Sequence, residues 1–151
     1  MGNGSFQFIE SDINVTLQCD FDLGDFDSDG DLDIVSTGVV GSNQLATKVY
    51  RNDGMFQFVE LPTSIPGVNY GSILWCDYDN DCDLDILITS GNYKQVWRYD
   101  GEGVFINTNA LQNTPTNPTY NLQSLVAGDY DNDGDTDLCI VTGKQIGRAH
   151  V

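Results

Sequence analysis

The sequence has few basic residues and only one histidine. Six Lys and Arg stand against 23 Asp and Glu in 151 residues, giving a formal net charge of −17. The basic residues do not cluster, so the sequence excludes nucleic acid as a partner, because that partner needs a positively charged surface. His150, the one histidine, lies at the extreme C-terminal end, which leaves no reliable base for Ser-His-Asp or Cys-His catalysis.

Long apolar runs are also missing. No stretch approaches the roughly 20 apolar residues that a membrane-spanning helix needs. The first ten residues, MGNGSFQFIE, lack the basic region and the apolar run of a secretory leader. We therefore expect no membrane insertion within these residues, and any evidence for export must come from elsewhere in the sequence.

The four cysteines form no C-x-x-C motif, which argues against a zinc or redox site. They are Cys19, Cys76, Cys82 and Cys139. We favour small, mostly buried thiols, and a disulfide such as Cys76–Cys82 remains an alternative.

Aspartate is abundant, and it recurs in a fixed pattern. The segments DFDSDGDLDIV, DYDNDCDLDIL and DYDNDGDTDLCIV begin at Asp25, Asp77 and Asp129, 52 residues apart. Self-similarity at a fixed period is typical of repeat architectures. The segments FQFIE from Phe6 and FQFVE from Phe56 repeat with a similar spacing. We therefore expect a repeat protein with one Asp-rich loop in each unit, at 25–33, 77–85 and 129–137.

The segments around these loops are typical of strands. IVSTGVV, ILITSG and LCIVTG are short, rich in β-branched residues and end near glycine. Before the first loop, VTLQCDFDL alternates apolar residues, including Phe21 and Leu23, with polar residues. No window supports a helix of ten residues. About four short strands in 52 residues predict an all-β chain of four-stranded antiparallel β-propeller blades, about two and a half in number.

The Asp loops have the chemistry of a calcium site. Calcium prefers six to eight oxygen ligands, mainly carboxylates and carbonyls. Aspartates at loop positions 1, 3 and 5 can converge on one ion, Gly at position 6 permits a sharp turn, position 7 offers its carbonyl, and the carboxylate at position 9 closes the shell. The predicted ligands are Asp25, Asp27, Asp29, Asp31 (carbonyl) and Asp33; Asp77, Asp79, Asp81, Asp83 (carbonyl) and Asp85; and Asp129, Asp131, Asp133, Asp135 (carbonyl) and Asp137.

Two other interpretations of the loops are less satisfactory. An EF-hand would need a bidentate Glu at position 12, where this chain has Ser36, Ile88 and Ile140. Asp, Asn and Gly also form plain turns, but turns do not need alternating acids three times in the same phase. We therefore expect one Ca²⁺ per loop, up to three in all.

With its Asp loops, apolar strands and aromatic–Asp-Gly turns, the chain resembles the FG-GAP and FG-GAP-like (VCBS) repeat family over residues 1–145. The resemblance implies β-propeller blades like those of integrin α-subunits, with calcium in the hairpin loop between the first two strands of each blade. It also implies a role in adhesion or in recognition of proteins or glycans. Closed propellers have more blades than this chain holds, so we expect it to be part of a larger propeller with neighbouring blades.

Three features depart from the family pattern. Cys82 stands where loop 2 should have glycine, so the second site is expected to be strained. The first repeat has a longer variable turn, within residues 38–48. The chain holds fewer than three blades, and its last copy is expected to stop after its second strand, at LCIVTG. The tail IGRAHV can be back-translated to a sequence that resembles read-through into a common sequencing adapter. We accordingly expect residues 146–151 to be a non-native tail.

These patterns favour a calcium-binding, extracellular recognition module that is not an enzyme. Acidic cages suit the millimolar calcium found outside cells. Glu10 and Glu60 occupy equivalent repeat positions, which indicates structural rather than catalytic use. The candidate recognition loops are 38–48 and 107–121, although we favour plain solvated connections for both, and Trp75 and Trp97 are expected in the core. Two alternatives are the non-catalytic propeller portion of a secreted enzyme, for example a carbohydrate-active one, and a structural spacer.

Overall fold

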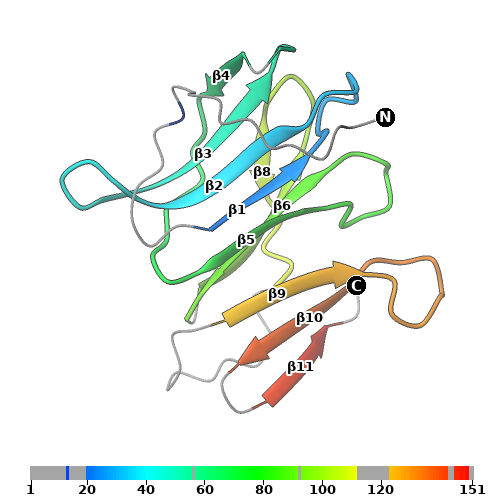
Figure 1. Ribbon diagram of the computed structural model, residues 1–151. Helices are drawn as coiled ribbons and strands as arrows, with labels where there is room; N and C mark the ends of the chain where they lie inside the picture. The colour runs from blue at the N-terminus through cyan, green and yellow to red at the C-terminus, as the bar shows by residue number, and fades with distance from the viewer. Residues whose placement is uncertain are drawn as a thin grey trace, which may run out of the picture.

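The computed structural model describes residues 13, 20–55, 57–91, 93–111, 123–142 and 145–149. All regular elements in these ranges are strands, which confirms the all-β prediction (Figure 1). None of the described residues belongs to a helix with the length and apolar character that a membrane span requires. The strands are β1 Asp20–Gly24, β2 Asp33–Val40, β3 Gln44–Asn52, β4 Phe58–Leu61, β5 Ser72–Cys76, β6 Asp85–Ser90, β7 Tyr93–Tyr99, β8 Phe105–Asn107, β9 Gln123–Gly128, β10 Asp137–Thr142 and β11 Gln145–Ala149.

The strands form three antiparallel meanders, here called blades 1, 2 and 3. Blade 1 has the order β1-β2-β3-β4, and blade 2 has the order β5-β6-β7-β8. Equivalent positions pair in the two blades: Gly24 opposes Asp33 in blade 1, and Cys76 opposes Asp85 in blade 2. These sheets confirm the predicted four-stranded antiparallel blades.

Blade 3 has one strand more than the sequence predicted. Its order is β9-β10-β11, and β11 pairs with β10 along Gln145–Ala149. The expectation that the last copy stops after its second strand is therefore wrong. The free edge of β10 offers backbone groups that a further extended segment can satisfy. That residues 146–151 are non-native stays a prediction, because strand pairing does not depend on their origin.

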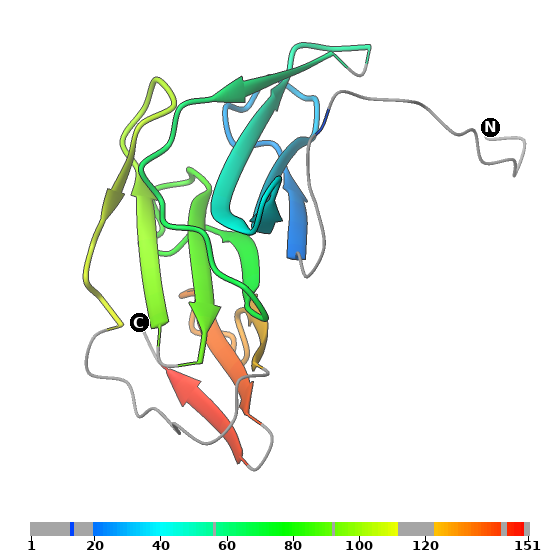
Figure 2. The same cartoon turned by 90° about the vertical axis from the view of Figure 1, so that its left-hand side faces the viewer.

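The three blades stack side by side through their first strands (Figures 1 and 2). β1 contacts β5, and β5 contacts β9. The face of β1 that meets β5 is the polar one. Asp20 Oδ2 accepts the N–H of Ile73 at 3.1 Å, and Asp22 Oδ2 accepts the N–H of Trp75 at 2.9 Å. The alternating apolar residues Phe21 and Leu23 point the other way and are 61% and 50% exposed.

Blades 1 and 2 enclose an aromatic core. Phe26 stacks on Trp75 with ring centroids 5.4 Å apart and an interplanar angle of 8°. Its ring also meets Tyr99 edge-on at 5.3 Å. Trp75 and Trp97 are only 7% and 8% exposed, which confirms that both tryptophans belong to the core. Phe26 is position 2 of the first Asp loop, so this loop is anchored in the interface between blades.

A second core lies between blades 2 and 3. It contains Cys76, Leu87 and Val96 of blade 2 and Leu125 and Leu138 of blade 3, together with Leu111. Tyr78, position 2 of the second Asp loop, packs against this cluster. The second loop is therefore anchored in the same way as the first, with the next blade as its support.

The predicted recognition loop at 38–48 is mostly strand. β2 and β3 cover all of it except Gly41–Asn43, where the Asn43 N–H donates to the Gly41 carbonyl at 3.0 Å. The extra residues of the first repeat lengthen a hairpin because their β-branched and alternating side chains continue the ladder. Most of the other predicted loop, 107–121, lies outside the described residues.

Candidate metal centre

The three Asp loops occupy the same place in their blades. Loop 1 (25–33) joins β1 to β2, loop 2 (77–85) joins β5 to β6, and loop 3 (129–137) joins β9 to β10. Figure 1 shows them along one edge of the molecule, in blue, green and orange. The prediction that each loop connects the first two strands of its blade is confirmed.

Each loop brings three carboxylates together. In each group, one carboxylate oxygen from every member lies within 4.8 Å of the others. Loop 1 combines positions 1, 3 and 5, whereas loops 2 and 3 combine positions 1, 3 and 9. The groups are Asp25, Asp27 and Asp29; Asp77, Asp79 and Asp85; and Asp129, Asp131 and Asp137.

The position-1 carboxylate shapes the turn. Asp25 Oδ1 accepts the N–H of Asp29, and its Oδ2 accepts the N–H of Gly30, both at 3.0 Å. Asp77 accepts the equivalent N–H groups of Asp81 and Cys82 at 3.2 and 3.0 Å. These bonds curl the loop around its first carboxylate. Position 1 can therefore be oriented toward an ion before any ion binds.

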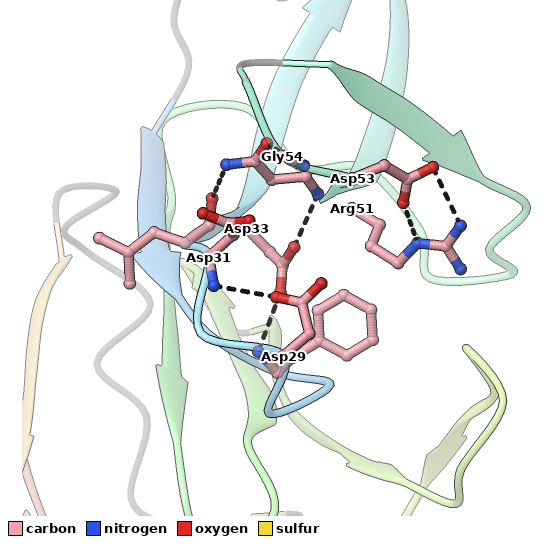
Figure 3. A network of polar contacts seen from close by, with 9 residues as sticks. Asp29, Asp31, Asp33, Arg51, Asp53 and Gly54 are labelled. Carbon is pink, nitrogen blue, oxygen red and sulfur yellow. Dashed lines mark hydrogen bonds and ion pairs between the residues drawn. The ribbon is translucent and has the colours of Figure 1, made fainter.

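Position 9 is a buried clamp, a role that the sequence did not reveal. Asp33 is fully buried; its Oδ2 accepts the Phe26 N–H at 3.0 Å and its Oδ1 accepts the Asn52 N–H at 2.8 Å. Figure 3 shows Asp33 beneath the turn that carries Asp53 and Gly54. Position 9 thus closes its own loop and fixes it to the third strand.

Loop 2 repeats this clamp. Asp85, also fully buried, accepts the N–H groups of Tyr78 at 2.9 Å and Tyr99 at 2.8 Å. In loop 3, Asp137 accepts the Tyr130 N–H at 3.0 Å. An ionised carboxylate has about four lone-pair sites, so two hydrogen bonds leave capacity for a metal ion.

Two backbone positions in every loop are left-handed. At position 6, φ is +96° for Gly30, +95° for Gly134 and +74° for Cys82. In loop 2, Cys82 therefore adopts the left-handed conformation for which the sequence pattern predicts glycine. Position 4 is also left-handed, which the sequence analysis missed, and its residues are Ser28 at +60°, Asn80 at +58° and Asn132 at +58°. The two asparagines were the available signal, because Asn tolerates this region better than most residues.

Burial and neighbouring carboxylates raise the pKa of particular aspartates in loops 1 and 2. Burial, followed by the charge of Asp29, raises the pKa of Asp27. Burial, followed by the charge of Asp81, does the same to the pKa of Asp79. For Asp85, burial outweighs its two backbone hydrogen bonds and raises the pKa to about 6. A bound cation would offset all of these effects.

One buried oxygen in loop 1 has no hydrogen-bond partner. It is Oδ1 of Asp27, and Asp27 is a member of the triad of loop 1. Such an atom is costly unless something pairs with it. The neighbouring guanidinium of Arg51 does not, since it pairs instead with Asp53 at 2.6 Å. In Figure 3 the Arg51 guanidinium turns toward Asp53 and away from Asp29 and Asp31.

The loops therefore fit a hard divalent cation. All three triads consist of carboxylate oxygens, the donor set that Ca²⁺ and Mg²⁺ prefer, and thiolate is absent from each triad. The side chains of Asp31, Asp83 and Asp135 are exposed and outside the triads, consistent with position 7 being predicted to contribute only its carbonyl. The carboxylates of Asp33, Asp81 and Asp133 also lie outside the triads. The full ligand set of each loop remains a prediction.

Cysteine takes no part in these groups. Cys76, Cys82 and Cys139 are free thiols, so the Cys76–Cys82 disulfide does not form. Cys76 is buried, and that burial raises its pKa to about 12. Cys82 is exposed at the turn of loop 2, contrary to the expectation of mostly buried thiols. Cys19 lies outside the described residues.

The fold and site define a repeat protein built from β-sheet blades, each with an acidic loop that could hold a metal ion. Comparison with protein families gives two matches to the FG-GAP-like repeat, over residues 25–88 and 77–140. Each match runs from one Asp loop through the next loop and into the strand after it. The chain therefore belongs to the FG-GAP-like repeat family. A search of curated proteins finds no match.

Proposed function

We propose that this chain is a calcium-binding module of an extracellular β-propeller that recognises protein or glycan partners, as adhesion proteins do. The supporting observation is the recurrence of a three-carboxylate group in the same loop of three successive blades. We propose calcium rather than magnesium because the triads do not share one fixed ligand geometry. The third carboxylate comes from position 5 in loop 1 and from position 9 in loops 2 and 3. Magnesium demands near-ideal octahedral geometry and keeps several waters.

The extracellular location rests on the same chemistry. Exposed aspartate loops of this kind suit dissociation constants of about 10⁻⁴–10⁻³ M, which are typical of extracellular modules. At the far lower calcium concentrations inside cells, such sites would remain unfilled. No catalytic role is proposed, because the candidate carboxylates are used by the loops and by their backbone hydrogen bonds.

Calorimetric titration with calcium tests the metal step. We expect uptake of up to three ions per chain at millimolar calcium, and weaker uptake of magnesium. Asp129→Ala should abolish binding in loop 3, because it removes a member of that triad. Asp100→Asn is the matched control, since Asp100 lies outside the loops and pairs with Arg98. A folded sample that takes up no calcium would refute the metal-binding proposal.

Recognition is tested separately from metal binding. Glycan arrays and extracellular protein libraries would be screened with the chain in calcium and in chelator. A recognition module should lose its ligand when residues 112–121 of the predicted loop are replaced by a short Gly-Ser linker, with Leu111 kept because it belongs to the second core. Shortening the Gly41–Asn43 hairpin tip is the matched change at another surface site. A spacer would bind nothing in the screen while still taking up calcium.

A further inference from the structure

The Asp loops of blades 2 and 3 are joined by a side-chain hydrogen bond. Asn80 Nδ2 donates to Asp135 Oδ1 at 2.6 Å, across 55 residues of sequence. Asn80 is position 4 of loop 2, between Asp79 and Asp81. Asp135 is position 7 of loop 3. The bond therefore connects two candidate metal sites that belong to different blades.

Both ends of this bond are tied to the geometry of their own site. Asn80 holds a left-handed backbone, with φ of +58°, directly after the triad member Asp79. The Asp135 N–H donates to Asp133 Oδ1 at 3.0 Å, and its carbonyl is the predicted position-7 ligand. Ordering one loop therefore restricts the part of the other loop that would face an ion.

Blades 1 and 2 provide an internal comparison. The residue equivalent to Asn80 in loop 1 is Ser28, which has nearly the same backbone, with φ of +60°. The residue equivalent to Asp135 in loop 2 is Asp83. Among the described residues, no hydrogen bond joins Ser28 to Asp83, because the serine side chain is shorter and lacks an amide. Loops 1 and 2 thus share the architecture of loops 2 and 3 without the bridge.

We propose that loops 2 and 3 bind cations as a coupled pair, whereas loop 1 binds independently. This inference rests on the proposed calcium binding. A cation that orders loop 2 fixes Asn80, so part of the entropy cost of ordering loop 3 is already met, and the reverse holds equally. A bound cation also weakens the negative potential at its neighbours, but that effect acts between loops 1 and 2 as well. Comparing the two loop pairs therefore isolates the contribution of the hydrogen bond.

Terbium luminescence can follow one loop at a time in the full chain. Position 2 is Tyr78 in loop 2 and Tyr130 in loop 3, so the luminescence lost on Tyr130→Phe reports occupancy of loop 3. We expect Asp79→Asn, which disables loop 2, to weaken terbium binding in loop 3 by about three- to tenfold, the equivalent of one hydrogen bond. In an Asn80→Ser background, the same Asp79→Asn change should weaken terbium binding in loop 3 less, because only the electrostatic effect of the cation in loop 2 is then lost.

Asp27→Asn is the matched control because it disables loop 1, whose neighbour is loop 2 and whose pair lacks the bridge. It should weaken terbium binding in loop 2, followed through Tyr78, by less than Asp79→Asn weakens binding in loop 3. Ser28 shows that serine is accepted at position 4, so Asn80→Ser should fold. All loops could bind terbium while Asp79→Asn weakens binding in loop 3 equally with and without Asn80→Ser. That result would overturn this inference and leave the proposed function standing. If none of the loops bound terbium or calcium, both this inference and the proposed function would be overturned. In calcium-depleted buffer, the bridge should also slow hydrogen exchange at the Asp135 amide, and Asn80→Ser should abolish that protection.

Discussion

At the scale of single residues, Cys82 shows how one side chain can strain a loop. Its φ of +74° lies in the region that glycine occupies at the same position of loops 1 and 3. A left-handed residue other than glycine costs roughly 1–2 kcal/mol, whereas glycine costs roughly 0.5–1 kcal/mol through its freer unfolded chain. Cys82→Gly should therefore raise the free energy of unfolding by about 0.5–1 kcal/mol and tighten calcium binding in loop 2. Chemical denaturation and calcium titration measure the two effects.

The reverse change in loop 3 is the control. A Cβ on Gly134 would meet nothing within 4 Å, so Gly134→Ala adds backbone strain without a steric clash. It should lower stability by a similar amount. If Cys82→Gly destabilises the protein while Gly134→Ala is neutral, backbone strain is not what distinguishes loop 2.

Because Asp85 has a raised pKa, we expect the slope of the free energy of unfolding against pH to change sign when calcium is added. Its pKa rises from 3.8 to about 6 in the metal-free fold, so the folded state takes up a proton more readily than the unfolded chain. This stabilisation is complete below pH 3.8, is lost as the pH rises through 6, and amounts to about 3 kcal/mol. In calcium-depleted buffer, the free energy of unfolding should therefore fall from pH 5 to pH 7.

Saturating calcium should reverse that slope, because the ion requires the ionised carboxylate and competes with the proton. Stability would then rise from pH 5 to pH 7, where aspartates of ordinary pKa stay ionised. Denaturation series at several pH values, with and without calcium, provide the measurement. Parallel slopes in the two series would contradict the assignment of Asp85 to the cation site.

At the scale of the loop and its strands, position 9 separates structural stability from metal binding. Asp33→Ala would leave the buried N–H groups of Phe26 and Asn52 without a partner, at a cost of about 2–5 kcal/mol. This loss should appear in calcium-depleted buffer, because the clamp is made by backbone groups. Thermal melts of the metal-free protein would detect it.

Asp31→Ala is the matched control at the exposed position 7 of the same loop. It should change metal-free stability by no more than about 0.5 kcal/mol, as surface substitutions usually do. If Asp33→Ala were harmless without calcium, position 9 would be a ligand alone and not a clamp.

Periodicity allowed the loops and blades to be predicted from the sequence, because each Asp segment is followed by an apolar strand at a constant spacing. The alternating acids also identified the type of site. The sequence did not reveal which carboxylates converge, since Asp33 and Asp85 occupy the same position but only Asp85 joins a triad. Nor did alternation identify the buried face of β1, because Asp20 and Asp22 are held there by N–H groups of another blade.

At the scale of the whole molecule, the Asp loops and the cores between blades form one structure. Phe26 follows the first aspartate of loop 1 and stacks in the core shared with blade 2. Tyr78, at the same position of loop 2, packs against the core between blades 2 and 3. Ordering loop 1 or loop 2 around an ion therefore also fixes an aromatic side chain of that loop against the next blade. Calcium should stabilise the stack of blades as well as the loops themselves.

Calcium depletion should consequently lower the melting temperature of all described blades together. At free calcium 100 times the dissociation constant, each independent site adds roughly 2.7 kcal/mol, a large share of a typical stability of about 5–15 kcal/mol. Calorimetric scans and tryptophan fluorescence, which reports Trp75 and Trp97 in the first core, should shift by the same amount. Sodium chloride at equal ionic strength is the control, since screening alone relieves repulsion without filling the triads. A fluorescence transition whose temperature does not change with calcium would mean that the core is independent of the loops. Phe26 would then stack on Trp75 whether or not an ion orders loop 1.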